Sequence, residues 1–235
     1  ACITEAPIDL FITLVRSDRP IVRVLGWNMA AAFRSPQIAK AIDDELTKRV
    51  VAGQEEAALI PALAEAVKAN RLKSAYSLMR QGLMVHGDDS FAKAMISLEP
   101  EEASNDFLNY LAKASVEELR QLNQTSVNYY SCLIILNHLI HHPVSLNHPH
   151  IGYIFLYAIS RNQALSDLGR QVLESHIIRN KEQMALILSR MPVWIQVAYV
   201  ESARQQMNPQ TARLLTELKD VTPYQDVVEE ISQLR

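Results

Sequence analysis

The feature that most constrains this chain is the recurrence of a proline directly after a polar or acidic residue. The pairs are Ser35-Pro36, Glu99-Pro100, Asn208-Pro209 and Thr222-Pro223. We expect prolines to begin helices in the same way at Asp18-Arg19-Pro20, His148-Pro149 and Met191-Pro192. Proline fits the first helical position because the N–H it lacks would have no partner there, and the preceding side-chain oxygen accepts a first-turn N–H. The chain therefore begins a new helix at short intervals.

Between these starts the apolar residues have helical spacing. Ile8, Phe11, Ile12 and Val15 share one face of a helix. No Asn-Gly or Asp-Gly turn joins two alternating segments, so hairpins of strands are not indicated. We predict an all-α fold of about twelve to fourteen short antiparallel helices, each near the usual length. The expected spans are 5–16, 20–33, 36–51, 60–69, 72–81, 90–97, 100–112, 116–122, 126–142, 149–160, 163–176, 180–190, 192–206, 209–219 and 223–234.

Composition limits the classes of protein to consider. With 235 residues, of which 49% are hydrophobic and 21% charged, the chain can bury a core and is not expected to be disordered. A net charge of −3 argues against a general nucleic-acid binder. Cys2 and Cys132 are too few for a disulfide framework or a four-cysteine zinc site. No composition break marks a boundary, so we expect a single helical domain over residues 1–235.

Targeting signals are not legible in the sequence. No apolar run approaches eighteen residues, and no basic stretch precedes an apolar core at the start. We therefore expect a soluble, intracellular (cytoplasmic) protein without a membrane span. No phosphate-binding glycine loop, Gly-x-Ser-x-Gly or Cys-x-x-Cys occurs, and no cofactor is expected.

Three helix-turn-helix segments can be laid on one another, at residues 63–82, 155–174 and 200–219. Counted from Ala66 and Ala203, the first and third both have alanine nine residues on and leucine twelve residues on, and the second follows a similar plan with a one-residue drift. Small residues at such positions let two helices approach closely, while leucines fill the seam to the next pair. This spacing predicts stacked helical hairpins, an α-solenoid.

The first segment resembles an ankyrin repeat over residues 61–89. The matching positions are Leu63, Ala66, Leu72, Ala75, Leu78, Met79, Gly82 and Val85. The resemblance implies that Gly82 ends a helix in a left-handed conformation. Pro61 sits one residue early for the family's Thr-Pro-Leu-His turn, Asn70 replaces the usual inter-helix glycine, and neighbouring windows do not repeat the pattern. What is implied is one degenerate ankyrin-like unit in an ankyrin/HEAT-like array, and such arrays generally bind other proteins.

The middle of the chain is unusually poor in acids, with no Asp or Glu from Leu119 to Ser166. It contains the span 126–142, which is apolar on most helical faces. A helix of this kind is buried. We expect a core helix, and the alternative is that part of it lines a groove or a dimer interface.

Five of the seven histidines lie between residues 138 and 150. His138 and His142 are four residues apart, which places both imidazoles on one helical face, a spacing that zinc sites use. The glutamate of His-Glu-x-x-His is absent, and no carboxylate lies within sixteen residues of the cluster. The pair is therefore a weak metal-ligand candidate, and the alternative is a helix end at which histidines face the carbonyl groups before Pro143.

A second candidate set lies near the start of the chain. Arg16, Arg19 and Arg23 are basic, and Trp27 lies one helical turn beyond Arg23. Arginine and tryptophan dominate the residues that hold protein partners, so these four are weak candidates for a partner surface. The alternative is a solvated basic face with Trp27 packed in the core.

The function predicted from these patterns is a non-enzymatic scaffold or adaptor that binds another protein along a helical-repeat surface. The alternative is an all-α metal-binding protein or enzyme centred on the histidine-rich segment 138–150. A third hypothesis is a helical scaffold that contacts nucleic acid through its arginines. The sequence names neither the partner nor the oligomeric state.

Overall fold

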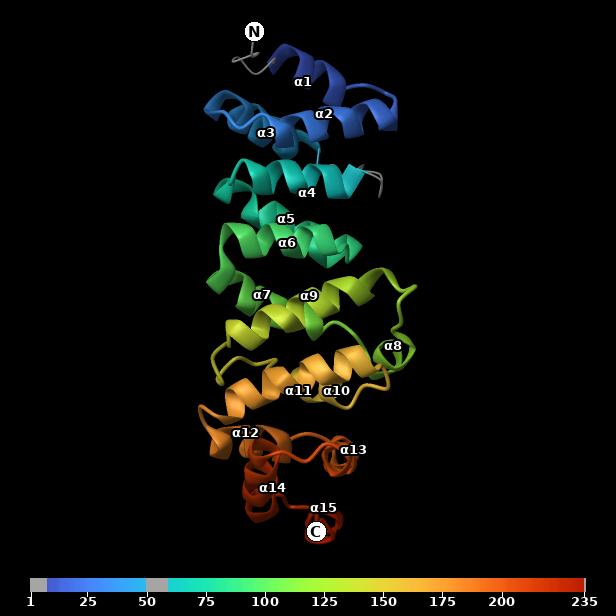
Figure 1. Ribbon diagram of the computed structural model, residues 1–235, viewed down its shortest axis with the longest axis vertical. Helices are drawn as coiled ribbons and strands as arrows, with labels where there is room; N and C mark the ends of the chain where they lie inside the picture. Colours follow the sequence, from blue (N-terminus) through green and yellow to red (C-terminus); the bar gives the residue numbers. More distant parts are fainter. Residues whose placement is uncertain (1–7, 50–58, 235) are drawn as a thin grey trace. The chain divides into compact units, whose positions relative to one another are not determined.

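The computed structural model describes residues 8–49 and 59–234. Within these ranges the chain forms fifteen α-helices and no strand, which confirms the predicted all-α class (Figure 1). Fifteen is also the number of spans expected from the sequence, one more than the stated range of twelve to fourteen. The bounds of the helices agree with most of the expected spans to within a few residues. None of the helices in this part of the chain is long and apolar enough to cross a membrane.

The chain divides into two compact units, Ala1–Ala103 and Ser104–Arg235. Unit 1 contains α1 (Ile8–Val15), α2 (Pro20–Ala32), α3 (Pro36–Arg49), α4 (Ile60–Ala69), the 3₁₀ helix η3 (Lys73–Ala75), α5 (Tyr76–His86) and α6 (Asp89–Leu98). Helix α7 (Pro100–Leu111) begins in unit 1 and ends in unit 2. Unit 2 contains α8 (Val116–Gln121), α9 (Val127–His141), α10 (Tyr153–Ala158), α11 (Gln163–Ile177), α12 (Lys181–Ser189), α13 (Val193–Gln205), α14 (Pro209–Val221) and α15 (Gln225–Ser232). The single domain expected over residues 1–235 stays a prediction.

The helix starts follow the proline pattern. Helices α2, α3, α7 and α14 begin at the prolines Pro20, Pro36, Pro100 and Pro209. The Ser35 hydroxyl accepts the Ile38 N–H at 3.2 Å, and the Asn208 side chain accepts the first-turn N–H groups of Gln210 and Thr211. At α8 the Ser115 hydroxyl accepts the Glu118 N–H, while the Glu118 carboxylate accepts the Ser115 N–H at 2.7 Å. These caps satisfy N–H groups that a helix leaves unpaired at its start.

The helix expected over 72–81 is the 3₁₀ turn η3 followed by α5, which runs to His86. Two of the starts expected at prolines are also displaced. Helix α10 begins at Tyr153, whereas the sequence predicted a helix from residue 149, and residues 149–152 form turns. Helix α15 begins at Gln225, two residues later than predicted from Thr222-Pro223. Proline is compatible with a helix start but also with an extended or turn residue. Pro149 and Pro223 are of the second kind, because each lies in the loop before its helix.

Within the ankyrin-like segment the role expected of Gly82 is wrong. Gly82 lies inside α5, where it is buried, and a Cβ there would lie 2.5 Å from the Phe91 ring. Gly87, at φ 68°, is in the left-handed region and ends α5. The absence of a side chain at Gly82 allows Phe91 of α6 to approach, and the helix continues past Gly82.

In unit 1, α2 packs against α1 and α4, and α4 packs against α6 (Figure 1). The α1–α2 contact is close because Gly26 has no side chain; a Cβ there would lie 2.8 Å from Val15 Cγ1. Phe11 and Trp27 meet edge to face beneath this contact with their ring centroids 5.5 Å apart. The Asn70 side chain donates to the Ala30 carbonyl at 2.8 Å and connects the end of α4 to α2.

In unit 2, α11 packs against α9 and α10, α12 packs against α14, and α13 packs against α15. The α10–α11 contact is made backbone to backbone at Gly169, where a Cβ would lie 2.6 Å from the Ala158 nitrogen. The Ser166 hydroxyl donates to the Ala158 carbonyl at 2.7 Å beside it. Contact between helices that are not sequence neighbours, in both units, is compatible with a helical repeat.

Helix α9 belongs to the core of unit 2, as expected. Its buried side chains are Tyr129, Ser131, Cys132, Ile135, Leu136, His138 and Leu139. Burial of the larger apolar members contributes about 1.5–3 kcal/mol each. Tyr130 lies on the other side of the helix and is half exposed.

The proposed correspondence between residues 63–82 and 200–219 is not matched by equal burial. Ala75 is fully buried, whereas Ala212, its counterpart, is exposed. Leu78 is half-buried and Leu215 is buried. Residues at corresponding positions of the two segments therefore differ in burial.

Candidate functional site

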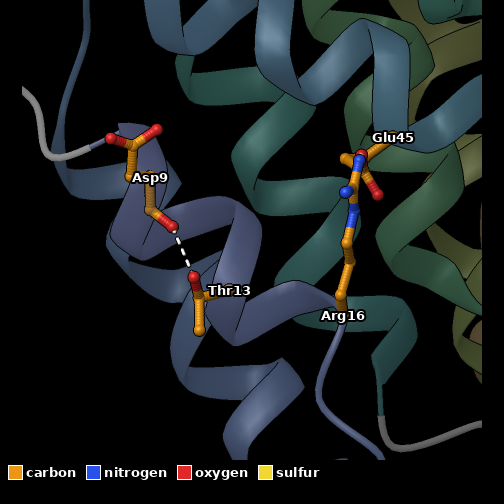
Figure 2. Close-up of polar contacts among 4 residues, drawn as sticks. All are labelled: Asp9, Thr13, Arg16 and Glu45. Carbon is orange, nitrogen blue, oxygen red and sulfur yellow. Dashed lines mark hydrogen bonds and ion pairs between the residues drawn. The ribbon is translucent and has the colours of Figure 1, made fainter.

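Two of the three arginines proposed as a partner surface, Arg16 and Arg23, have intramolecular contacts. Arg16 follows α1 and points to Glu45 of α3, whose carboxylate is buried; Arg16 Nε and Nη2 donate to Glu45 Oε1 at 3.1 and 2.5 Å (Figure 2). This pairing raises the pKa of Arg16. One turn earlier on α1, the Thr13 hydroxyl donates to the Asp9 carbonyl at 2.7 Å (Figure 2). Arg16 therefore compensates a buried charge and connects α1 to α3.

The other members of that set are divided between the interior and the surface. Trp27 is completely buried and does not lie on a surface with the arginines. Arg23 donates to the Ser17 carbonyl at 3.0 Å, and Arg19 is exposed. Of the three arginines, Arg19 is thus the one for which the described structure records no contact through the guanidinium.

His138 and His142 do lie on one face of α9 and its end. Their rings stack with centroids 4.4 Å apart and an interplanar angle of 16°. His138 is buried, its Nε2 lies 3.1 Å from the Ser104 hydroxyl, and its ring meets Phe107 edge to face. Stacked rings present parallel faces to each other, whereas two ligands of one metal ion aim ring nitrogens at a common point.

The remaining histidines of the segment lie at the end of α9 or in the loop before α10. His148 and His150 have ring centroids 5.7 Å apart. Burial and the neighbouring His150 lower the pKa of His148, against a backbone contact with Asn105 that raises it. Within residues 8–49 and 59–234 no three His, Cys, Asp or Glu side chains gather in a way that holds a metal ion.

A groove of about 890 Å³ lies in unit 2 between α12 and the turns that precede α10. We call it the α12 groove; its lining residues are Leu146, Asn147, His148, Pro149, Ile151, Gly152, Tyr153, Asn180, Glu182, Gln183, Leu186, Ile187, Arg190, Met191 and Pro192. The turns reach α12 at Gly152, where a Cβ would lie 3.6 Å from Ile187 Cγ2. The Gln183 amide donates to the Asn147 side-chain oxygen at 3.0 Å and links the two walls a second time.

The wall formed by α12 is apolar in its middle and polar toward its ends. Leu186 is 42% exposed although it is a large apolar side chain on a well-formed helix. The carboxamides of Asn147, Asn180 and Gln183 lie in the same lining. A carboxamide offers both a donor and an acceptor, which is the pair of groups that a peptide main chain presents. The groove therefore combines a place for an apolar side chain with groups that recognise a peptide backbone.

Two opposite charges lie on the α12 wall. Glu182 is in the first turn, and Arg190 follows the last residue of the helix in helical conformation. Both are exposed, and in the described part of the chain neither side chain forms an ion pair or a hydrogen bond. The neighbouring Lys181, by contrast, is paired with Glu217 of α14. The groove thus carries one unpaired charge of each sign.

A second cleft of about 590 Å³ lies in unit 2 near α8, α11 and α13. Arg170 lines it, and its Nη2 donates to the hydroxyls of Ser166 and Ser202 at 2.9 and 3.0 Å, while Nη1 donates to Gln206. Trp194 is 41% exposed on its rim. Because the Arg170 head group is held by three side chains of α11 and α13 and the residue after α13, it acts as a packing element between these helices.

The sequence reasoning missed the α12 groove. Its walls come from residues 146–153 and 180–192, which are separated by α10 and α11, and a helix was expected where the structure has the turns at 149–152. The signals available in the sequence were two prolines, Pro149 within the first wall and Pro192 at the end of the second.

Comparison with known proteins returned no relative: no family model, no curated protein and no solved structure matches the chain. The ankyrin resemblance of residues 61–89 therefore stays a prediction.

Proposed function

We propose that this protein is a non-enzymatic, helical-repeat scaffold that binds a segment of another protein in the α12 groove. The observation that carries the proposal is Leu186, a large apolar side chain exposed on the wall of a groove whose other residues include three carboxamides. An exposed apolar side chain in a concave, polar-rimmed site is typical of places where partners dock.

The cytoplasmic location and the ankyrin-like unit at residues 61–89 belong to this proposal and have their support in the sequence alone. The histidine segment supports the alternative of a metal enzyme less well, because the His138 and His142 rings are stacked and His138 is engaged with Ser104. Of the arginines proposed as a partner surface, Arg16 is already paired with Glu45 and is less available to a partner.

The experiment places the photo-reactive residue p-benzoylphenylalanine at position 186 and, as a control, at Thr216, which is exposed on α14. Cells expressing each variant are irradiated, the adducts found only at position 186 are identified, and the partner is purified. We expect the purified partner to bind the wild-type chain directly and Leu186→Asp to weaken that binding at least about tenfold. Identical adducts at both positions, or an affinity unchanged by Leu186→Asp, would contradict the proposal.

A further inference from the structure

The α12 groove has a repeat along its length that fits one backbone conformation of a bound segment. Glu182, Leu186 and Arg190 are successive i, i+4 positions, so they follow one another along one stripe of α12 at intervals of about 6 Å. In an extended peptide every second side chain points to the same face, at intervals of about 6.6 Å. Residues 1, 3 and 5 of an extended segment therefore fall opposite these three positions.

The chemistry of the stripe orders the segment. Glu182 favours a basic side chain, the exposed Leu186 an apolar one, and Arg190 an acidic side chain or a terminal carboxylate. Both charged residues lack an ion-pair partner within the described residues, so a bound segment breaks no existing pair. Gln183 Nε2 donates to Asn147 Oδ1 across the groove, so Asn147 Nδ2 and Gln183 Oε1 are the donor and the acceptor that remain for main-chain groups of the segment.

We infer that the α12 groove takes an extended partner segment of five residues with a basic side chain at one end, an apolar side chain in the middle and an acidic group at the other. This inference rests on the proposed function and specifies its partner by charge order. The segment binds in one direction only, because reversing it would place like charges together at both ends of the stripe.

The test uses two capped pentapeptides as probes. Lys-Ala-Leu-Ala-Glu has the inferred charge order, and Glu-Ala-Leu-Ala-Glu places an acidic side chain opposite Glu182 in either backbone direction. Each is titrated into the ¹⁵N-labelled full chain, and amide shifts give its affinity. We expect millimolar binding of Lys-Ala-Leu-Ala-Glu with shifts centred on residues 146–153 and α12, and about fivefold weaker binding of Glu-Ala-Leu-Ala-Glu at low salt, because exposed ion pairs are individually weak. The variant Glu182→Lys should reverse the preference.

A charge reversal on another exposed surface is the matched control. Asp220 lies exposed at the end of α14, outside the groove, and Asp220→Lys changes the net charge as Glu182→Lys does but should leave the preference as in the wild type. Equal affinities of the two peptides, a preference that Glu182→Lys does not reverse, or no shift in the groove with either peptide would each overturn the inference. The proposed function would fail separately, through cross-links at position 186 that match those at position 216.

Discussion

Helices α11 and α12 are neighbours in unit 2, yet they use their polar and small residues in opposite ways. On α11, Gly169 receives the backbone of α10, His176 is completely buried, and Arg170 is held by side chains from α11 and α13. On the α12 wall, Glu182 and Arg190 have no ion-pair partner in the described residues, and Leu186 faces solvent. The contrast separates residues that hold the fold together from residues that are available to a partner.

The largest effect is expected at the closest contact of α11. In Gly169→Ala the new Cβ would lie 2.6 Å from the Ala158 nitrogen, and since backbone cannot move aside as a side chain can, α10 must shift. We expect a loss of about 3 kcal/mol in the free energy of unfolding, measured by urea denaturation. Gly152→Ala in the groove wall is the matched control, because its Cβ would meet α12 at an ordinary 3.6 Å and should change stability by less than about 0.5 kcal/mol. Equal losses of stability at Gly169 and Gly152 would show that the α10–α11 contact is no tighter than the contact of the groove wall with α12.

The second effect is a dependence of stability on pH that comes from the buried His176. Its Nδ1 lies 2.8 Å from the Val172 carbonyl, and burial lowers its pKa below the ordinary 6.5, assisted by Arg179. A histidine with a lowered folded-state pKa stabilises the fold above its unfolded pKa, and this stability is lost as the pH falls through the folded pKa. The free energy of unfolding should therefore be flat above about pH 7.5 and fall below about pH 6.5, by at most about 1.4 kcal/mol per pH unit for one proton.

His148 acts in the same direction because its pKa is also lowered. The variant His176→Leu isolates the α11 contribution: its stability should depend on pH less steeply than that of the wild type, whereas His148→Asn should flatten the curve to a smaller degree. Denaturation midpoints at a series of pH values measure both slopes. A His176→Leu curve parallel to the wild type would show that His176 does not carry the effect.

The third effect uses the two asparagines that begin these helices. Asn162 Oδ1 accepts the Leu165 N–H at the start of α11, and Asn180 Oδ1 accepts the Gln183 N–H at the start of α12. Replacing either by alanine should cost about 1 kcal/mol in the free energy of unfolding. Asn180 also lines the groove, so only Asn180→Ala should weaken partner binding in a titration at equal folded fraction. Equal weakening by both variants would assign the loss to stability rather than to the groove.

The smallest effect on stability is expected from Leu186→Asp. The side chain is 42% exposed on α12, so its replacement loses only part of a leucine's burial together with some helix propensity, about 1 kcal/mol or less in the free energy of unfolding. Urea denaturation of the variant checks this. A loss comparable to that of Gly169→Ala would place Leu186 among the packing residues and overturn its assignment to a binding surface.

The sequence predicted the helices better than the groove. Prolines at Pro20, Pro36, Pro100 and Pro209 mark true starts because a first-turn residue needs no N–H, a local requirement that is legible from one residue and its neighbour. Pro149 satisfies the same local rule but precedes a loop. Whether a compatible start is used depends on what packs against it, and that information is not local.

Glycines show the same limit. A helix end was expected at Gly82, but the helix ends at Gly87, and Gly82 instead makes room for the Phe91 ring of α6. Trp27 was left open between core and surface; it is buried against Phe11, a residue that the helical spacing had already placed on an apolar face. The groove depends on residues 146–153 meeting α12 across two intervening helices, which no local pattern describes.

Hydrogen exchange with and without the purified partner tests the central claim most directly. The turns at residues 146–153 are not shielded by a helical hydrogen-bond ladder along their whole length, so a segment bound in the α12 groove must slow exchange there. We predict protection on partner binding at residues 146–153 and in α12, lost in Leu186→Asp, with α11 unchanged. Protection confined to unit 1, or to the Arg170 cleft, with the groove exchanging as in the free protein, would contradict the claim.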